Sequence, residues 1–93
     1  MSLISVVVPV YQNEGSLADL LPRLVAASQR SPQDSFEYLF VDDGSRDGSL
    51  DLLRSLAKED ARVKIIKLSR NFGSWAAILA GLFYARGEAA VTI

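Results

Sequence analysis

Hydrophobic positions follow two alternating patterns along this chain. Short, continuous apolar runs alternate with longer segments in which apolar residues recur every three or four positions. The first pattern is typical of strands buried on both faces, and the second of amphipathic helices. The expected strands are residues 4–8, 36–41, 63–68 and 89–93. Strands that alternate with helices predict an α/β protein with a parallel sheet and right-handed crossovers, in the order βαβαβαβ.

Several residues mark where these elements should begin or end. We expect Pro9 to end the first strand, because proline cannot donate a hydrogen bond in a central ladder. The first helix should begin at Ser16 and contain Pro22, which costs a hydrogen bond or introduces a kink. The later helix boundaries are predicted from cap residues, with Asp47 or Ser49 before the second helix and Gly87 after the third.

Composition narrows the class of protein. The chain has 93 residues and a net charge of −1, which allows one domain and disfavours nucleic acid as a partner. It has no cysteine and no histidine, so neither a thiolate metal site nor a histidine-based triad can form within it. We see no signal peptide and no apolar run near the roughly 18–20 residues that span a bilayer. A cytoplasmic location is therefore expected.

Polar, turn-forming residues follow the first strand, and their chemistry suits ligand binding. Tyr11 offers an aromatic face for stacking on a base, and Asn13 and Glu14 can accept hydrogen bonds from hydroxyl or ring N–H groups. A helix-entry loop is the alternative interpretation, since an acidic residue complements the dipole at a helix start. That alternative explains Glu14 well and Tyr11 poorly. The carboxyl ends of parallel strands meet at one edge of the sheet, where ligands bind.

The loops after the second and third strands add charged candidates. Asp42 and Asp43 could bind a metal, accept a hydrogen bond from a sugar or base, or cap the next helix. The pair alone does not complete a metal site, because hard cations want six or more oxygens. Arg70 suits a phosphate but equally a structural ion pair. Trp75 is expected in the core, because it shares a helical face with Ile78, Leu79, Leu82 and Phe83.

Two common nucleotide-binding motifs are absent. No Gly-x-Gly-x-x-Gly follows the first strand, and no Gly-x4-Gly-Lys-Ser/Thr occurs anywhere in the chain. A dinucleotide-binding domain and a P-loop are therefore disfavoured.

Three segments together resemble the amino-terminal half of a family 2 glycosyltransferase. VVVPVYQNEGSL is similar to the family's opening strand and loop, and VDDGSRDGS to its Val-Asp-Asp-Gly-Ser-x-Asp-x-Ser/Thr signature. LSRNFGSWAAILAGLFYARGE resembles a narrower motif of the polyprenyl-phosphate sugar transferases, the branch that includes dolichol-phosphate mannose synthase-like and undecaprenyl-phosphate glycosyltransferase-like enzymes. One departure stands out: Ser74 and Trp75 occupy positions where the family often has His-Gln.

The resemblance implies a GT-A fold, with a Rossmann-like parallel sheet and flanking helices. Residues 1–93 would be its amino-terminal nucleotide-sugar-binding part, truncated before the Asp-x-Asp motif expected just beyond Ile93. No catalytic or metal-ligating residue then falls within the chain. The nucleotide-binding residues that the resemblance implies are Pro9, Tyr11, Asn13, Glu14, Val41, Asp42, Asp43 and Arg70, with Val41 acting through its backbone.

The resemblance also implies a reaction and its partners. The full-length protein would be a hexosyltransferase of cell envelope biosynthesis at the cytoplasmic membrane face. It would transfer a sugar from a UDP- or GDP-linked donor to a polyprenyl phosphate, with Mg²⁺ or Mn²⁺ held outside this chain. The 93 residues alone are expected to be inactive.

Two hypotheses from other classes compete with this interpretation. A receiver-like binding module would need its acidic pair after the first strand, whereas Asp42 and Asp43 follow the second. A non-catalytic remnant could self-associate through an open sheet edge, because an exposed edge presents unpaired backbone groups.

Overall fold

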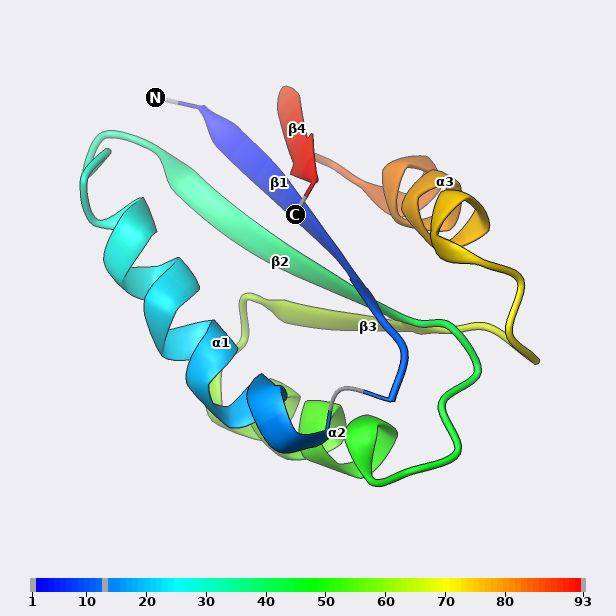
Figure 1. Ribbon diagram of the computed structural model, residues 1–93. Helices are drawn as coiled ribbons and strands as arrows, with labels where there is room; N and C mark the ends of the chain where they lie inside the picture. Colours follow the sequence, from blue (N-terminus) through cyan, green and yellow to red (C-terminus); the bar gives the residue numbers. More distant parts are fainter. Residues whose placement is uncertain (1, 13, 93) are drawn as a thin grey trace.

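Figure 1 shows a computed structural model, which describes residues 2–12 and 14–92 and only the backbone of Glu14. The predicted βαβαβαβ order is confirmed. All strand pairs are parallel, and the sheet order is β3-β2-β1-β4. The elements are β1 (Leu3–Val10), α1 (Glu14–Ser28), β2 (Ser35–Asp42), α2 (Ser49–Glu59), β3 (Val63–Lys67), α3 (Ser74–Tyr84) and β4 (Ala89–Thr92).

The helices form two layers, one on each face of the sheet. In Figure 1, α1 and α2 lie on one side of the strands and α3 lies on the other. Val6 and Phe40 belong to the core under α1 and α2, whereas Val7 and Leu39 belong to the core under α3. Successive side chains of a strand point to opposite faces, so each central strand supplies both cores.

The first strand continues through Pro9, so the expectation that Pro9 would end it is wrong. Pro9 pairs with Val41 of β2. The carbonyl of Val10 accepts a hydrogen bond from the N–H of Asp43 on the β2 side at 2.8 Å, so the backbone of Pro9 faces the β4 side. There the described pairing stops at Val7 opposite Thr92. Pro9 has no N–H, but no described residue of β4 pairs with it, so no described hydrogen bond between β1 and β4 is lost.

Three helix boundaries also differ from prediction. α1 begins two residues before Ser16. Pro22 lies in its interior and leaves the carbonyl of Ala18 without an N–H donor. Both residues are exposed, so water can bind this carbonyl. The N-cap of α2 is Gly48, although the carboxylate of Asp47 still accepts a hydrogen bond from the N–H of Ser49 at 3.0 Å. The third helix ends with a C-cap at Ala85, not at Gly87.

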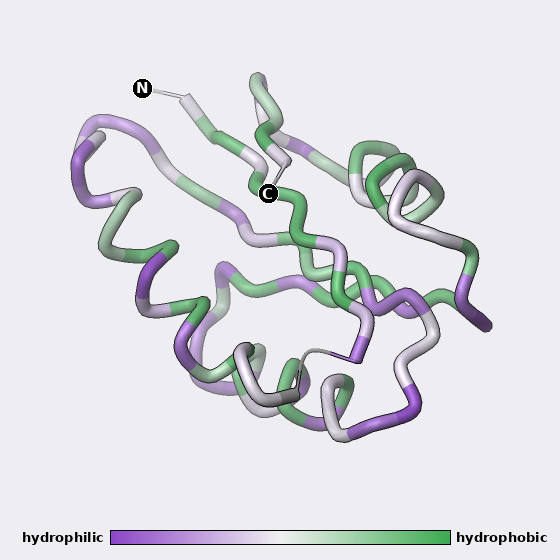
Figure 2. The backbone as a smooth tube through the Cα atoms, viewed as in Figure 1, coloured by the Kyte–Doolittle hydropathy of each residue, from purple (hydrophilic) through white to green (hydrophobic). Residues whose placement is uncertain are grey.

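The orientation of α3 is the largest departure from the sequence-based expectation. Trp75 is 76% exposed and Phe83 is 82% exposed, although both were expected in the core. Leu79 and Leu82 are exposed too, and Ile78 is half-buried. Figure 2 shows hydrophobic colouring around most of the turns of α3. A helix that is apolar all round gives no periodic signal for which face meets the sheet.

Small residues form the face of α3 that does meet the sheet. Ala77 and Gly81 are the buried residues of this helix. A Cβ atom added at Gly81 would overlap the side chain of Val7 and crowd that of Val41. These β-branched side chains are stiff, so they cannot move aside cheaply. The helix therefore lies close to the sheet because its inner face is small.

We expect Gly81→Ala to lower the free energy of unfolding by about 1–3 kcal/mol, because it overpacks this contact. Gly15→Ala is the matched control in α1, where nothing lies within 4 Å of the added Cβ. It should raise stability by about 0.5–1 kcal/mol through helix propensity. Urea unfolding of both variants measures the difference, and equal shifts would contradict the packing account.

A buried polar network joins β1 and β2 to the segment before β4. The hydroxyl of Ser5 donates to the carboxylate of Glu37, which also accepts the N–H of Arg86 at 2.8 Å. The N–H of Gly87 donates to the Ser5 hydroxyl at 2.8 Å, and a Cβ at Gly87 would overlap Ser5. Gly87 is therefore needed for close approach to β1. Burial raises the pKa of Glu37, but the Ser5 and Arg86 hydrogen bonds and the charges of Arg86 and Lys64 lower it below its ordinary value.

This lowered pKa predicts a loss of stability in acid. The contribution of Glu37 is fully present above the ordinary carboxyl pKa and disappears as the pH falls through the lower value of the folded state. The wild type should therefore exceed Glu37→Gln in unfolding free energy near neutral pH, and the gap should shrink in acid. Urea unfolding across this range measures the gap. A gap that does not change with pH would assign the effect to packing instead.

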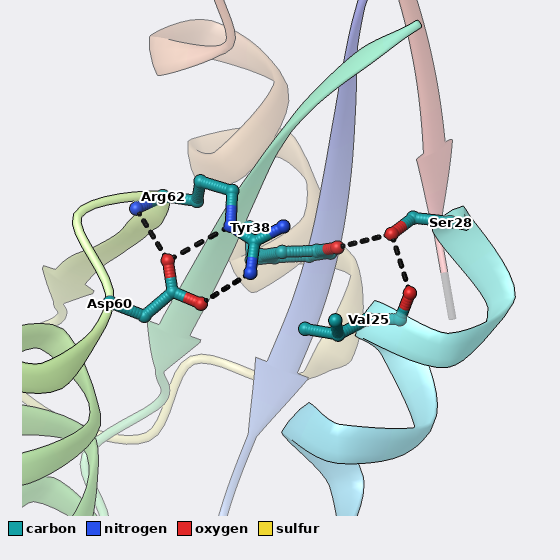
Figure 3. A network of polar contacts seen from close by, with 5 residues as sticks. All are labelled: Val25, Ser28, Tyr38, Asp60 and Arg62. Atoms are coloured by element: carbon teal, nitrogen blue, oxygen red, sulfur yellow. Dashed lines mark hydrogen bonds and ion pairs between the residues drawn. The ribbon is translucent and has the colours of Figure 1, made fainter. Parts of the chain in front are cut away.

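A second network lies at the same amino-terminal end of the sheet, on the face covered by α1 and α2 (Figure 3). The buried Tyr38 donates its hydroxyl to Ser28 at 3.0 Å, and Ser28 donates to the carbonyl of Val25 at 2.7 Å. The guanidinium of Arg62 lies 5.6 Å from the centre of the Tyr38 ring and is held by Asp60 at 2.7 and 2.9 Å. This network anchors α1 and β3 to β2, far from the loops that follow the strands.

Candidate functional site

Three loops meet at the carboxyl ends of β1, β2 and β3. The N–H of Gln12, in the loop after β1, donates to the hydroxyl of Ser45 at 2.8 Å. Gln12 has a φ of 53°, a left-handed conformation that few non-glycine residues adopt. The N–H of Leu68, directly after β3, donates to the carbonyl of Asp42 at the end of β2 at 2.9 Å, which holds the starts of the second and third loops side by side. The loops are thus bonded to one another rather than independent.

Asp43 is the main connection between the second and third loops. Its Oδ1 accepts the N–H of Phe72 at 2.8 Å, and its Oδ2 accepts the N–H of Gly73 and the side-chain amide of Asn71, both at 3.0 Å. Asn71 also donates to the Asp43 carbonyl at 3.1 Å. Asp43 is buried. A carboxylate accepts about four hydrogen bonds, so Oδ1 retains capacity for one further donor.

Gly44 allows these two loops to approach each other. Its φ of +73° lies in the left-handed region, and an added Cβ would overlap the backbone of Arg70 and Asn71. Backbone atoms cannot rotate away as a side chain can. Glycine is therefore required here both by conformation and by the closeness of the third loop.

A cavity of about 240 Å³ opens beside these loops. The strand order places it at the point where ligands bind in open α/β sheets: β2 lies on one side of β1 and β4 on the other, so the order of connection reverses at β1. The N-terminal residue of α3, Ser74, belongs to the wall. The full lining is Pro9, Val10, Tyr11, Asp43 and Ser74.

Three of the residues expected to bind a nucleotide therefore come together, namely Pro9, Tyr11 and Asp43. Tyr11 is 44% exposed, so part of its ring is accessible to a ligand. Pro9 and Tyr11 come from β1 and the loop after it, whereas Asp43 follows β2. Their contact with a nucleotide is a prediction.

Of the other expected residues, Val41, Asp42 and Arg70 do not line this cavity. Val41 is buried in the core beneath α3. Asp42 is also buried, and neither of its carboxylate oxygens has a hydrogen-bond partner within the described residues. Arg70 lies over the ring of Phe72, 4.5 Å from its centre. Asn13 lies outside the described residues, as does the side chain of Glu14, which begins α1.

Sequence reasoning missed Ser74 as a residue of the cavity. The available signal was its position: Ser74 begins a helix directly after a strand-end loop, and it replaces the histidine that the resemblance leads one to expect. The preceding Gly73 has a φ of +101°, which turns the chain from the loop into α3. Helix N-termini favour anionic groups, which is the chemistry of a phosphorylated ligand.

The described residues do not fit a metal site by themselves. Within residues 2–12 and 14–92, no group of three or more acidic side chains gathers in a way that could hold a metal ion. The Asp43 carboxylate is largely occupied by three N–H donors. We therefore derive no metal-dependent step from this chain.

The sequence profile of glycosyl transferase family 2 matches residues 5–93. The chain belongs to this family. It is 48% identical over 94 residues to the undecaprenyl-phosphate 4-deoxy-4-formamido-L-arabinose transferase of Pseudomonas paraeruginosa. The aligned region covers all of this chain and 27% of that relative. The chain thus spans about a quarter of the length of the curated relatives it matches. The predicted family is confirmed.

Solved structures support the same fold. The chain superposes on Staphylococcus aureus TarS 1–349 in complex with UDP with a TM-score of 0.81 at 31% identity, covering 97% of this chain and 26% of that one. For the mannosyltransferase PcManGT of Pyrobaculum calidifontis in complex with GDP-Man and Mn²⁺, the TM-score is 0.81 at 25% identity, covering 94% and 25%. The predicted GT-A fold is confirmed. Among the described residues, no helix combines the length and apolarity needed to cross a membrane.

Proposed function

We propose that this chain is the donor-binding part of a glycosyltransferase, and that the cavity lined by Tyr11, Asp43 and Ser74 holds the nucleotide of a UDP- or GDP-linked sugar. The observation that carries the proposal is the convergence of these residues at the carboxyl end of β1, where the strand order reverses. Membership of glycosyl transferase family 2 and the UDP and GDP-Man complexes of similar structures support it.

Each lining residue has a role in this proposal. The exposed part of the Tyr11 ring stacks on the base, because every base has a face suited to an aromatic platform. The Oδ1 atom of Asp43 accepts an N–H of the base, using the capacity that its contact with Phe72 leaves. Ser74, at the start of α3, lies where a phosphate benefits from the helix dipole.

The remaining parts of the reaction lie outside these 93 residues. The acceptor is a polyprenyl phosphate, as the name of the Pseudomonas relative suggests, and the whole enzyme works at the cytoplasmic face of the membrane. A Mg²⁺ or Mn²⁺ ion, in keeping with the Mn²⁺ complex of PcManGT, is held by residues that follow this chain. The chain alone should therefore show no sugar transfer, and measurable transfer would contradict the proposal.

Calorimetric titration with UDP and GDP, with and without Mn²⁺, tests the proposal. We expect binding of at least one nucleotide that is largely independent of metal. Tyr11→Ala should weaken it by about tenfold or more, since stacking on an aromatic ring contributes about 1–3 kcal/mol per base. Tyr84→Ala is the matched control, because Tyr84 is exposed on α3 and lies outside the cavity. Absence of binding to the folded chain, or equal effects of both variants, would contradict the proposed pocket.

A further inference from the structure

The outer face of α3 is an exposed apolar surface that the proposed nucleotide site does not use. We define this outer face by Trp75, Leu79, Leu82 and Phe83, which are between 42% and 82% exposed. They recur at helical spacing along the side that points away from the sheet. The Phe83 ring packs edge-on against Tyr84, with ring centres 5.2 Å apart, which extends the surface. Contiguous apolar surface of this kind marks an interaction site.

The charged side chains beside this surface are predominantly basic. Residues 63–87, which include β3 and α3, contain four basic residues and no acidic residue, although the whole chain has a net charge of −1. A cavity of about 570 Å³ lies beside α3, and its charged lining residues are the basic Lys64, Lys67 and Arg86 and one acidic residue, Glu37. Arg70 lies before the first turn of the helix. The apolar outer face is therefore bordered by positive charge.

Two observations indicate what covers this face. First, the residues of α3 that face the sheet and those that are exposed are both apolar, a pattern typical of a helix enclosed between two layers of a larger protein. Second, the chain spans only 27% of the length of the Pseudomonas relative, so a protein of that size has ample polypeptide to form another layer. All four described residues of β4 are exposed as well, whereas parallel sheets usually have both faces covered.

We propose that the outer face of α3 is an internal packing surface, covered in the whole enzyme by an apolar segment of the same polypeptide beyond residue 93. This inference rests on the proposed function, which makes the chain part of a longer transferase. Because the basic residues beside this face outnumber the acidic Glu37, charge complementarity predicts acidic residues at the margin of the covering segment, opposite Lys67. The covering segment thereby encloses α3, whose first residue lines the nucleotide cavity.

Trp75 is the only tryptophan in the chain and reports directly on this surface. The test compares the 93-residue chain with the whole gene product, in which every other tryptophan is replaced by phenylalanine. We expect red-shifted emission and efficient acrylamide quenching of Trp75 in the short chain. In the whole protein, the emission should shift to the blue and the quenching constant should fall several-fold.

Charged substitutions on the same face provide a second readout. Leu79→Glu and Phe83→Glu should leave the melting temperature of the 93-residue chain nearly unchanged and should lower that of the whole protein. Ala26→Glu is the matched control, because Ala26 is an exposed helical residue in the opposite layer. Nucleotide binding by the short chain should survive all three variants, so a failure of the nucleotide-site proposal would be visible separately in the UDP and GDP titrations.

Four results would overturn the proposal. The first is a gene that ends at residue 93. The second is a folded whole protein in which acrylamide quenches Trp75 as readily as in the short chain. The third is shielding of Trp75 that rises with the concentration of the short chain, which would assign the face to a second copy. Finally, shielding of Trp75 in the whole protein only after addition of phosphatidylglycerol vesicles would assign the face to a membrane surface.

Discussion

Asp43→Ala is expected to abolish nucleotide binding and to lower the free energy of unfolding by about 3 kcal/mol. The carboxylate of Asp43 accepts hydrogen bonds from the backbone of Phe72 and Gly73 and from the side chain of Asn71. Alanine leaves these donors without their charged acceptor and frees the third loop from the second. Calorimetry with UDP and GDP, performed well below the melting temperature, separates lost binding from lost folding.

Asp42→Asn is the matched control for this prediction. Asp42 is the neighbouring residue and is equally buried, but neither of its carboxylate oxygens has a partner among the described residues. Removing a buried acid without partners should leave stability unchanged or raise it by about 1 kcal/mol. Equal destabilisation by both variants would contradict the role assigned to Asp43. Loss of binding in Asp42→Asn with unchanged stability would identify Asp42 as a further nucleotide contact.

Gly44→Ala is expected to disrupt the site nearly as strongly. A residue with a side chain at a φ of +73° costs about 1–2 kcal/mol, and the added Cβ also overlaps the backbone of Arg70 and Asn71. The third loop must therefore move away from the second, which breaks the hydrogen bonds of Asp43. We expect a loss of about 3 kcal/mol in unfolding free energy and at least tenfold weaker nucleotide binding.

Gly73→Ala separates the two causes of this effect. Gly73 also has a positive φ, of +101°, but an added Cβ there would meet nothing within 4 Å. Its cost is therefore backbone strain alone, about 1–3 kcal/mol. Urea unfolding and UDP titration of both variants provide the comparison. If Gly44→Ala proved no more harmful than Gly73→Ala, close approach of the two loops would not be the reason for glycine at residue 44.

Part of the nucleotide cavity was predictable from local sequence. Tyr11 and Asp43 each follow an apolar run directly, and a parallel sheet brings such strand ends together. Ser74 was not found, because its place in the cavity depends on where α3 starts relative to β1. The hydrogen bonds of Asp43 to residues about 30 positions away were equally out of reach. A local pattern carries no information on which distant backbone donors a carboxylate will meet.

The sequence by itself determined the order of strands and helices, the parallel sheet and the family, because apolar periodicity and motif spacing are local properties. Only the tertiary structure decided the strand order β3-β2-β1-β4, which depends on where each crossover returns to the sheet. It also decided which side of α3 is buried. Apolar residues surround that helix, so the choice was made by the closeness of approach that Ala77 and Gly81 allow against Val7 and Val41.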